Sequence, residues 1–83
     1  MKIKFTEHAL FKIDILHRHG FNVEISMIEN AILSPDKIEK GYKDRFIAQK
    51  IYDSEHVLRV VYEIKAQEIH VVTVYPGRIK RYG

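Results

Sequence analysis

The stretch HVLRVVYEIK at residues 56–65 is followed closely by EIHVVTVYP at residues 68–76, and this pair decides the fold. Both segments alternate with a period of two and carry β-branched residues on both faces, which is typical of central strands. The short polar link between them predicts a hairpin, so the two strands are expected to be antiparallel neighbours. Alternation then places Arg59 among apolar neighbours, on the face opposite Tyr62.

The same periodicity extends upstream of this hairpin. It predicts strands at residues 37–41 and 45–53, joined to their neighbours by short polar loops. KIKF at residues 2–5 predicts one further short strand. A twisted, mainly antiparallel sheet of four to five strands is therefore expected.

Helical patterns occupy the N-terminal part of the chain. Thr6 is a candidate N-cap for a helix from residue 7 to about residue 19, which is expected to end at Gly20. Ala9, Leu10, Ile13 and Leu16 form its predicted apolar face. A second helix is predicted to run to about Leu33, with Ser26 and Glu29 as a capping box and Pro35 as its stop; Asn22 is a competing start.

The predicted order is β-α-α-β-β-β-β over a single domain, residues 1–83. This order indicates an α+β fold in which two N-terminal helices pack on one face of the sheet. The apolar residues that point away from the helices then require a dimer interface, a protein partner or a concave binding surface.

The charge excess of the chain is local. The sequence has 14 Lys and Arg residues against 11 Asp and Glu residues, a formal net charge of +3. Arg78, Lys80 and Arg81 lie in the last nine residues with no acid beside them, so the rest of the chain is formally neutral. A localised cationic patch attracts polyanions or an acidic protein, although basic tails also serve as solubilising features.

Several classes of function have no support in the sequence. There are no cysteines, so disulfides, thiolate metal sites and a cysteine nucleophile are excluded. The histidines lack metal-ligand spacing, and nucleotide-binding glycine motifs are missing, so neither a metal nor a cofactor is expected. No apolar run approaches the ~20 residues of a membrane span, and a cytoplasmic protein is expected.

The remaining candidates are cations, tyrosines and one histidine. Metal-free cleavage of RNA needs a base, fixed positive charge and an acid. His8 could act as acid or base, Arg59, Arg78 and Arg81 could stabilise charge, and Tyr62, Tyr75 and Tyr82 could stack or donate a proton. A structural role is open for each: His8 could simply cap its helix, Tyr62 could belong to the core, and Glu63 could neutralise Arg59.

The segments FTEHAL, HGF, ILSPDKIEKG, HVLRVVYE and VVTVYPGRIKRY together resemble a family of short prokaryotic proteins classified as a domain of unknown function. That family lies near the RelE/ParE and BrnT toxins of toxin-antitoxin systems, within the barnase-EndoU-colicin-RelE ribonuclease group. The resemblance covers nearly the whole chain. Its most specific parts are His8, Arg45, the run from Arg59 to Tyr62, and the ending from Tyr75 to Tyr82.

This resemblance implies a RelE-like toxin that cleaves messenger RNA, including ribosome-associated mRNA, without a metal. The catalytic residues implied by the resemblance are Arg59, Arg78, Arg81 and Tyr82, and His8 is added to this catalytic set as the candidate acid or base. Residues binding nucleic acid or a partner would be Lys12, Arg45, Tyr75 and Lys80. An antitoxin protein is the implied partner, and a homodimer is a further option. ParE-like relatives lack the nuclease residues and act on DNA gyrase, so the alternative is a non-catalytic module that binds an acidic protein or nucleic acid.

The C-terminal YPGRIKRYG, residues 75–83, carries a last structural prediction. Pro76-Gly77 suits the centre of a type II turn at the end of a strand. An extended tail after that turn would place Arg78, Lys80 and Tyr82 on one side, with Ile79 anchoring the other.

Overall fold

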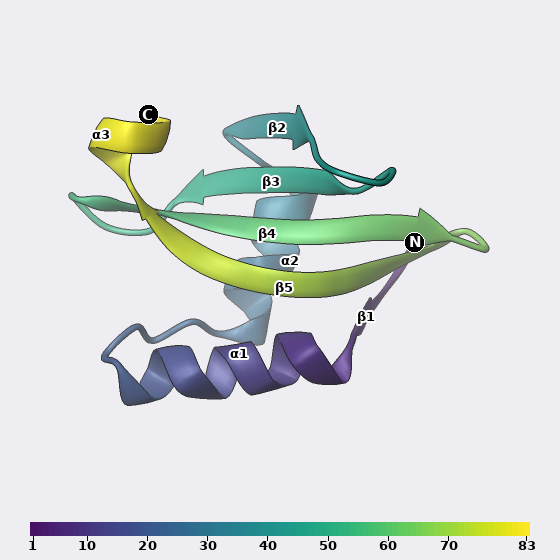
Figure 1. Cartoon of the computed structure of the whole chain (residues 1–83), viewed down its shortest axis with the longest axis horizontal. Coiled ribbons are helices and arrows are strands. Elements are labelled where there is room, and N and C mark those ends of the chain that lie inside the picture. The colour runs from purple at the N-terminus through teal and green to yellow at the C-terminus, as the bar shows by residue number, and fades with distance from the viewer.

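The structure is a computed structural model that describes all residues, 1–83, and it confirms the α+β class. A five-stranded sheet is accompanied by two longer helices and one short C-terminal helix (Figure 1). The elements in chain order are β1 (Lys2–Phe5), α1 (Glu7–Arg18), α2 (Ile25–Leu33), β2 (Lys37–Lys40), β3 (Phe46–Ile51), β4 (His56–Lys65), β5 (Glu68–Arg78) and α3 (Ile79–Tyr82).

The sheet has the strand order β1-β5-β4-β3-β2 and is mainly antiparallel, as predicted. β1 is the exception, because it pairs in parallel with β5 after the chain has crossed over through the helices. Val61 lies opposite Thr73 and Tyr62 opposite Val71, so Val72 is an extra residue that forms a bulge in β5.

Helix α1 begins where the sequence predicts. The Thr6 side chain accepts a hydrogen bond from the Ala9 amide at 3.1 Å and donates one to the Val72 carbonyl at 3.1 Å, which ties the helix start to β5. Ala9, Ile13 and Leu16 are buried, but the prediction for Leu10 is wrong, since it is 50% exposed. Leu10 lies at the edge of the apolar stripe, beyond the reach of the sheet.

Helix α2 starts at Ile25 with Glu24 as its N-cap, between the two predicted caps Asn22 and Ser26, and the capping box is wrong. Its N-cap is Glu24, which makes no side-chain cap hydrogen bond, and Ser26 lies inside the first turn. Burial of Val23 fixes this entry point, because that side chain is only 1% exposed. The Val23 carbonyl is also 2.7 Å from His17 Nε2, which holds the loop against α1.

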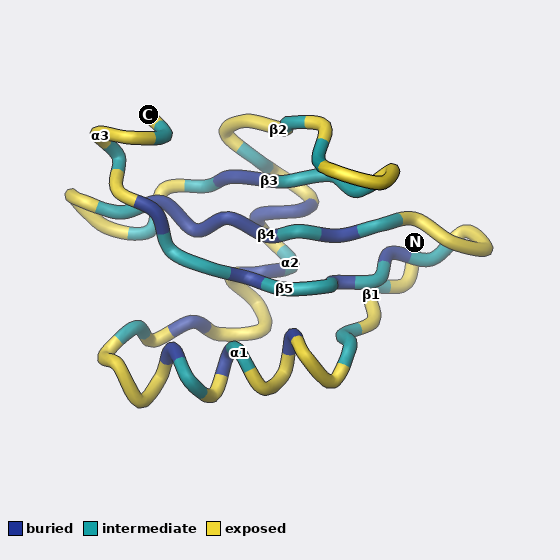
Figure 2. Tube along the Cα trace, viewed as in Figure 1, coloured by how far each residue is buried: buried dark blue, intermediate teal, exposed yellow.

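The core lies between the helices and the sheet. Its members come from α1, α2 and the central strands: Ala9, Ile13, Leu16, Val23, Ile28, Ala31, Ile32, Ala48, Leu58, Val60, Tyr62, Ile69, Val71 and Val74. Figure 2 shows buried segments in the middle of β3, mainly in the first half of β4, at intervals along β5 and on the inward turns of α1. None of the helices combines the length and the apolar character needed to cross a membrane.

The prediction of a turn and an extended tail at the C-terminus is wrong. β5 continues through Pro76 and Gly77, which pair with Leu58 and Val57, and α3 follows directly. Proline is tolerated here because β1 pairs only with residues 68–71 of β5, so the other edge of β5 is free at Pro76 and needs no N–H donor.

Candidate functional site

Arg59 is the centre of a polar cluster on the sheet face opposite the core. Its side chain is almost fully buried, and its guanidinium donates to the Tyr75 hydroxyl at 3.0 Å from Nε and to Glu39 Oε1 at 2.9 Å from Nη2. Nη1 donates to Gln49 Oε1. The three partners come from three different strands, β5, β2 and β3, so residues far apart in the sequence converge on one side chain.

Glu63 is not the partner of Arg59, contrary to one prediction. Four residues along a strand correspond to about 13 Å, which separates Glu63 from the Arg59 guanidinium. Glu63 instead accepts from Arg45 Nε at 3.4 Å and lies 3.0 Å from Lys65 Nζ. The hydrogen bond from Lys65 and, after it, that from Arg45 lower the pKa of Glu63 against the opposing effect of burial.

The C-terminal helix is attached to the same cluster. The guanidinium carbon of Arg59 lies 4.1 Å from the centre of the Tyr82 ring, a close cation–π contact. The Tyr82 carbonyl accepts from Gln49 Nε2 at 3.2 Å and from Lys37 Nζ at 3.1 Å. We refer to Arg59, Glu39, Gln49, Tyr75 and Tyr82 as the Arg59 cluster.

Gly77 makes this docking of α3 sterically feasible. A Cβ atom at position 77 would lie 2.4 Å from Tyr82 Cδ2 and 2.5 Å from Tyr82 Cε2, well inside van der Waals contact. The bare backbone of β5 therefore provides the surface on which the Tyr82 ring rests. The glycine is required for close approach at this point and not for a turn.

The ionisation of the Arg59 cluster is stable. Burial opposes the charged form of Arg59, but its hydrogen bonds to Tyr75 and Glu39 outweigh burial and raise its pKa. The hydrogen bond from Arg59 lowers the pKa of Glu39, against a smaller opposing effect of desolvation. The Arg59 guanidinium is thus charged in the folded protein, with Glu39 as its counter-ion and all of its nitrogens already hydrogen-bonded.

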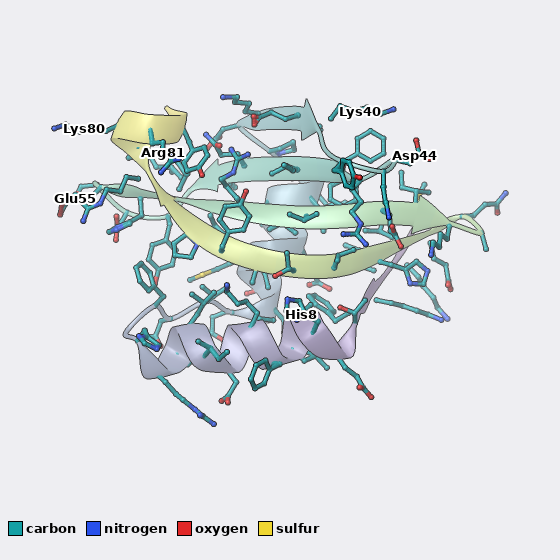
Figure 3. All side chains as sticks on the ribbon, viewed as in Figure 1. His8, Lys40, Asp44, Glu55, Lys80 and Arg81 are labelled. Carbon is teal, nitrogen blue, oxygen red and sulfur yellow. The ribbon has the colours of Figure 1, made fainter.

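Arg78, Lys80 and Arg81, hereafter the C-terminal cations, are all exposed. Figure 3 shows Lys80 and Arg81 on α3, at the same end of the molecule as Glu55. The Ile79 amide donates to the Glu55 carbonyl at 2.9 Å, which joins the start of α3 to the β3–β4 hairpin. Between these segments lies a cleft of about 320 Å³ lined by Ser54, Glu55, Arg78, Ile79 and Lys80.

The other predicted site residues lie elsewhere. His8 and Lys12 are on α1, which contributes to the core on one sheet face, whereas Tyr82 contacts Arg59 on the opposite face. In Figure 3, His8 and Arg81 accordingly lie on opposite sides of the sheet. Arg45 precedes β3 at the end of the sheet remote from α3 (Figure 1). One site containing His8, Arg59 and the C-terminal segment is therefore not formed.

Tyr62 has the structural role that was left open for it. It is 6% exposed and stacks on Phe46 with ring centres 5.6 Å apart. Burial raises its pKa above the ordinary value of 10.0. Tyr62 is a core aromatic, in contrast to Tyr75 and Tyr82.

One polar pair beside the cleft was missed by sequence reasoning. His56 Nδ1 lies 2.9 Å from Asp53 Oδ1, and the same carboxylate oxygen accepts from the backbone amides of Glu55 at 2.8 Å and His56 at 2.7 Å. These bonds, that from the Glu55 amide first, lower the pKa of Asp53. The signal in the sequence was an aspartate opening a hairpin loop with a histidine three residues later.

Comparisons with protein-family models, with curated proteins and with solved structures found no match for this chain. No group of three or more histidine, aspartate or glutamate side chains is arranged to hold a metal ion. The polar groups that the fold brings together are those of the Arg59 cluster and the C-terminal cations, beside the cleft.

Proposed function

We propose that this protein binds single-stranded RNA with its C-terminal cations and cleaves it without a metal ion, as a toxin-like endoribonuclease of the cytoplasm. The observation that carries the proposal is the anchoring of α3. Arg59 stacks on the Tyr82 ring, and Gln49 and Lys37 each donate a hydrogen bond to the Tyr82 carbonyl. The C-terminal cations are therefore presented at defined positions beside a cleft and not on a frayed tail.

The distribution of charge also favours the α3 end of the molecule as the RNA-binding site. All other charges sum to zero, so the local excess of three positive charges lies at α3 and the end of β5. Phosphate oxygens of RNA are the natural ligands for such a group, because binding releases condensed counterions. The forked guanidinium groups of Arg78 and Arg81 can each hold a phosphate through two hydrogen bonds.

The resemblance to RelE-like toxins supports the catalytic part of the proposal. Such proteins rely on basic residues and a C-terminal tyrosine, and here Arg78, Arg81 and Tyr82 are neighbours at one end of the molecule. Charge stabilisation of a developing phosphorane by fixed cations needs no metal. In this proposal Arg59 positions Tyr82 and does not itself contact the phosphate.

A second candidate function is favoured by the state of Arg59. Its guanidinium is already bound to Glu39, Gln49 and Tyr75, which leaves it unavailable as a free catalytic cation. The protein could then be a non-catalytic toxin-fold module whose C-terminal cations bind an acidic segment of a partner, such as an antitoxin. Both candidate functions predict binding through the C-terminal cations, so only a measurement of RNA cleavage distinguishes them.

The proposal is tested by measuring cleavage and binding of single-stranded RNA in EDTA. We expect the triple variant Arg78→Gln, Lys80→Gln, Arg81→Gln to lose cleavage. The slope of log affinity against log salt should also decrease in magnitude by about 2, because each contact to single-stranded nucleic acid contributes roughly 0.7.

A matched control removes three exposed cations elsewhere, at Lys2, Arg18 and Lys43, with the same change in net charge. This control should retain cleavage and most of the salt slope. Equal losses in both triple variants would show that only net charge matters and would overturn the proposal. RNA binding without any cleavage by the unmodified protein would favour the non-catalytic module.

A further inference from the structure

The Asp53–His56 pair lies next to the cleft, and Asp53 holds the His56 ring in one orientation. Asp53 Oδ1 and Oδ2 lie 2.9 and 3.2 Å from His56 Nδ1. The edge contact of His56 with Phe21, with ring centres 5.2 Å apart at 85°, restrains the ring from the other side. A carboxylate at Nδ1 and an aromatic wall together set the direction of Nε2.

His56 Nε2 is free to act. Only Nδ1 of this ring makes a hydrogen bond within the protein. No buried side-chain nitrogen or oxygen in the chain lacks a hydrogen-bond partner, so Nε2 must reach the surface. In many enzymes the general base is a histidine with Nδ1 bound to a carboxylate and Nε2 open to the substrate. His56 has the same arrangement.

Arg78 is the cross-strand neighbour of His56. The two residues are directly paired between β4 and β5, and such pairs project from the same face with Cβ atoms about 4.5–5.5 Å apart. Arg78 also lines the cleft together with Ser54 and Glu55, which are the loop residues between Asp53 and His56. A phosphate held by Arg78 would thus lie within reach of the His56 ring.

We propose that His56, oriented by Asp53, is the general base that acts on an RNA phosphodiester held by Arg78 and Lys80 at the cleft. This inference rests on the proposed ribonuclease function and names a catalytic histidine for it on β4. Asp53 is a positioning residue in this scheme. The charged and titratable groups around His56 are Asp53 and Glu55 of the hairpin, Tyr52 and Arg78.

The step is an internal transesterification. His56 Nε2 takes the proton of a ribose 2′-hydroxyl, and the 2′-oxygen attacks the adjacent phosphorus. A 2′,3′-cyclic phosphate forms as the bond from phosphorus to the 5′-oxygen breaks. The leaving 5′-oxygen takes a proton from water, and the proton on His56 returns to solvent to neutralise the hydroxide. No oxidant, reductant or metal enters this balance.

The purely structural alternative is that Asp53 only closes the hairpin. The backbone amides of Glu55 and His56 already bind this carboxylate, which is enough for a turn. The turn does not require a histidine at position 56, however. The two readings therefore differ in the effect of replacing His56 alone.

The test compares His56→Gln with His19→Gln, which replaces an exposed histidine at the end of α1. We expect His56→Gln to lower kcat/KM for single-stranded RNA by about 100-fold or more, with little change in the Kd for a 2′-deoxy analogue that cannot be cleaved. Asp53→Asn should lower kcat but not raise KM, and should add nothing in the His56→Gln background. His19→Gln should cleave normally.

An NMR titration with the same 2′-deoxy oligonucleotide provides a readout that does not depend on turnover. The ring resonances of His56 should shift, whereas those of His19 should not. If the unmodified protein cleaves RNA and His56→Gln cleaves it equally well, this inference is wrong while the proposed function stands. If the unmodified protein neither cleaves RNA nor shows a His56 shift, both fail.

Discussion

Replacement of Arg59 by methionine should lower the free energy of unfolding more than replacement of any exposed arginine. Methionine keeps the unbranched stem of the side chain but removes the guanidinium from the Arg59 cluster. The Gln49 oxygen then loses its donor, although Gln49 itself is only 4% exposed. An unsatisfied buried acceptor costs about 1–3 kcal/mol, and loss of the stack on Tyr82 adds about 0.5–2 kcal/mol.

Glu39 adds little to this total because its side chain is 34% exposed and water can replace the guanidinium. The expected loss of stability is therefore about 1.5–5 kcal/mol, which for a domain of this length lowers Tm by at least about 6 °C. Urea unfolding followed by circular dichroism measures the loss directly. Arg59→Lys should be intermediate, since it keeps the charge but not the planar fork.

Arg45→Met is the matched control. Arg45 also pairs with a glutamate, at 3.4 Å, but its side chain is 40% exposed. Exposed pairs contribute little, so this change should cost less than about a quarter of the Arg59→Met effect. Similar losses for Arg59→Met and Arg45→Met would refute the assignment of the Arg59 cluster as the buried anchor of α3.

Three further changes test other contacts. Thr6→Ala should cost about 1–2 kcal/mol in urea unfolding through loss of the α1 cap, whereas Thr6→Ser should recover most of it. Gly77→Ala should displace Tyr82, seen as faster amide hydrogen exchange in α3 with an otherwise unchanged exchange pattern; unchanged α3 protection would contradict the steric argument. The pKa of Glu39 lies below its ordinary 4.5, so its ion pair stabilises the fold above about pH 5, and the contribution is lost as pH falls through the folded-state pKa. Glu39→Gln should accordingly flatten the acid side of the stability curve, and a curve of unchanged slope would argue against the pair.

The central hairpin could be predicted because the residues that specify it lie within the two strands and the link between them. Alternating β-branched residues and a short polar link define β4 and β5 without reference to the rest of the chain. The start of α1 at Thr6 is local in the same sense, since cap and capped amide are three residues apart. The alternation of the strand also placed Arg59 among apolar neighbours, where an arginine needs a counter-ion or a ligand.

The identity of that counter-ion could not be predicted. Glu39 lies 20 residues from Arg59 in the chain. It reaches Arg59 only because β2 pairs with β3, and β3 with β4, each in a particular register. The short helix α3 was missed for a similar reason. IKRY has no capping residue or apolar period of its own, and Tyr82 is held by contacts to Gln49, Lys37 and Arg59 instead.

The burial of Arg59 changes how loss of activity in its variants must be interpreted. An inactive Arg59 variant has lost the anchor of α3, and with it the placement of the C-terminal cations, whether or not the guanidinium ever meets RNA. Exposed cations behave differently, because their removal alters salt dependence with little effect on folding. A catalytic or binding role can therefore be assigned to Arg78 and Arg81 from activity alone. For Arg59 it can be assigned only if activity falls further than the stability of the fold and the position of α3 explain.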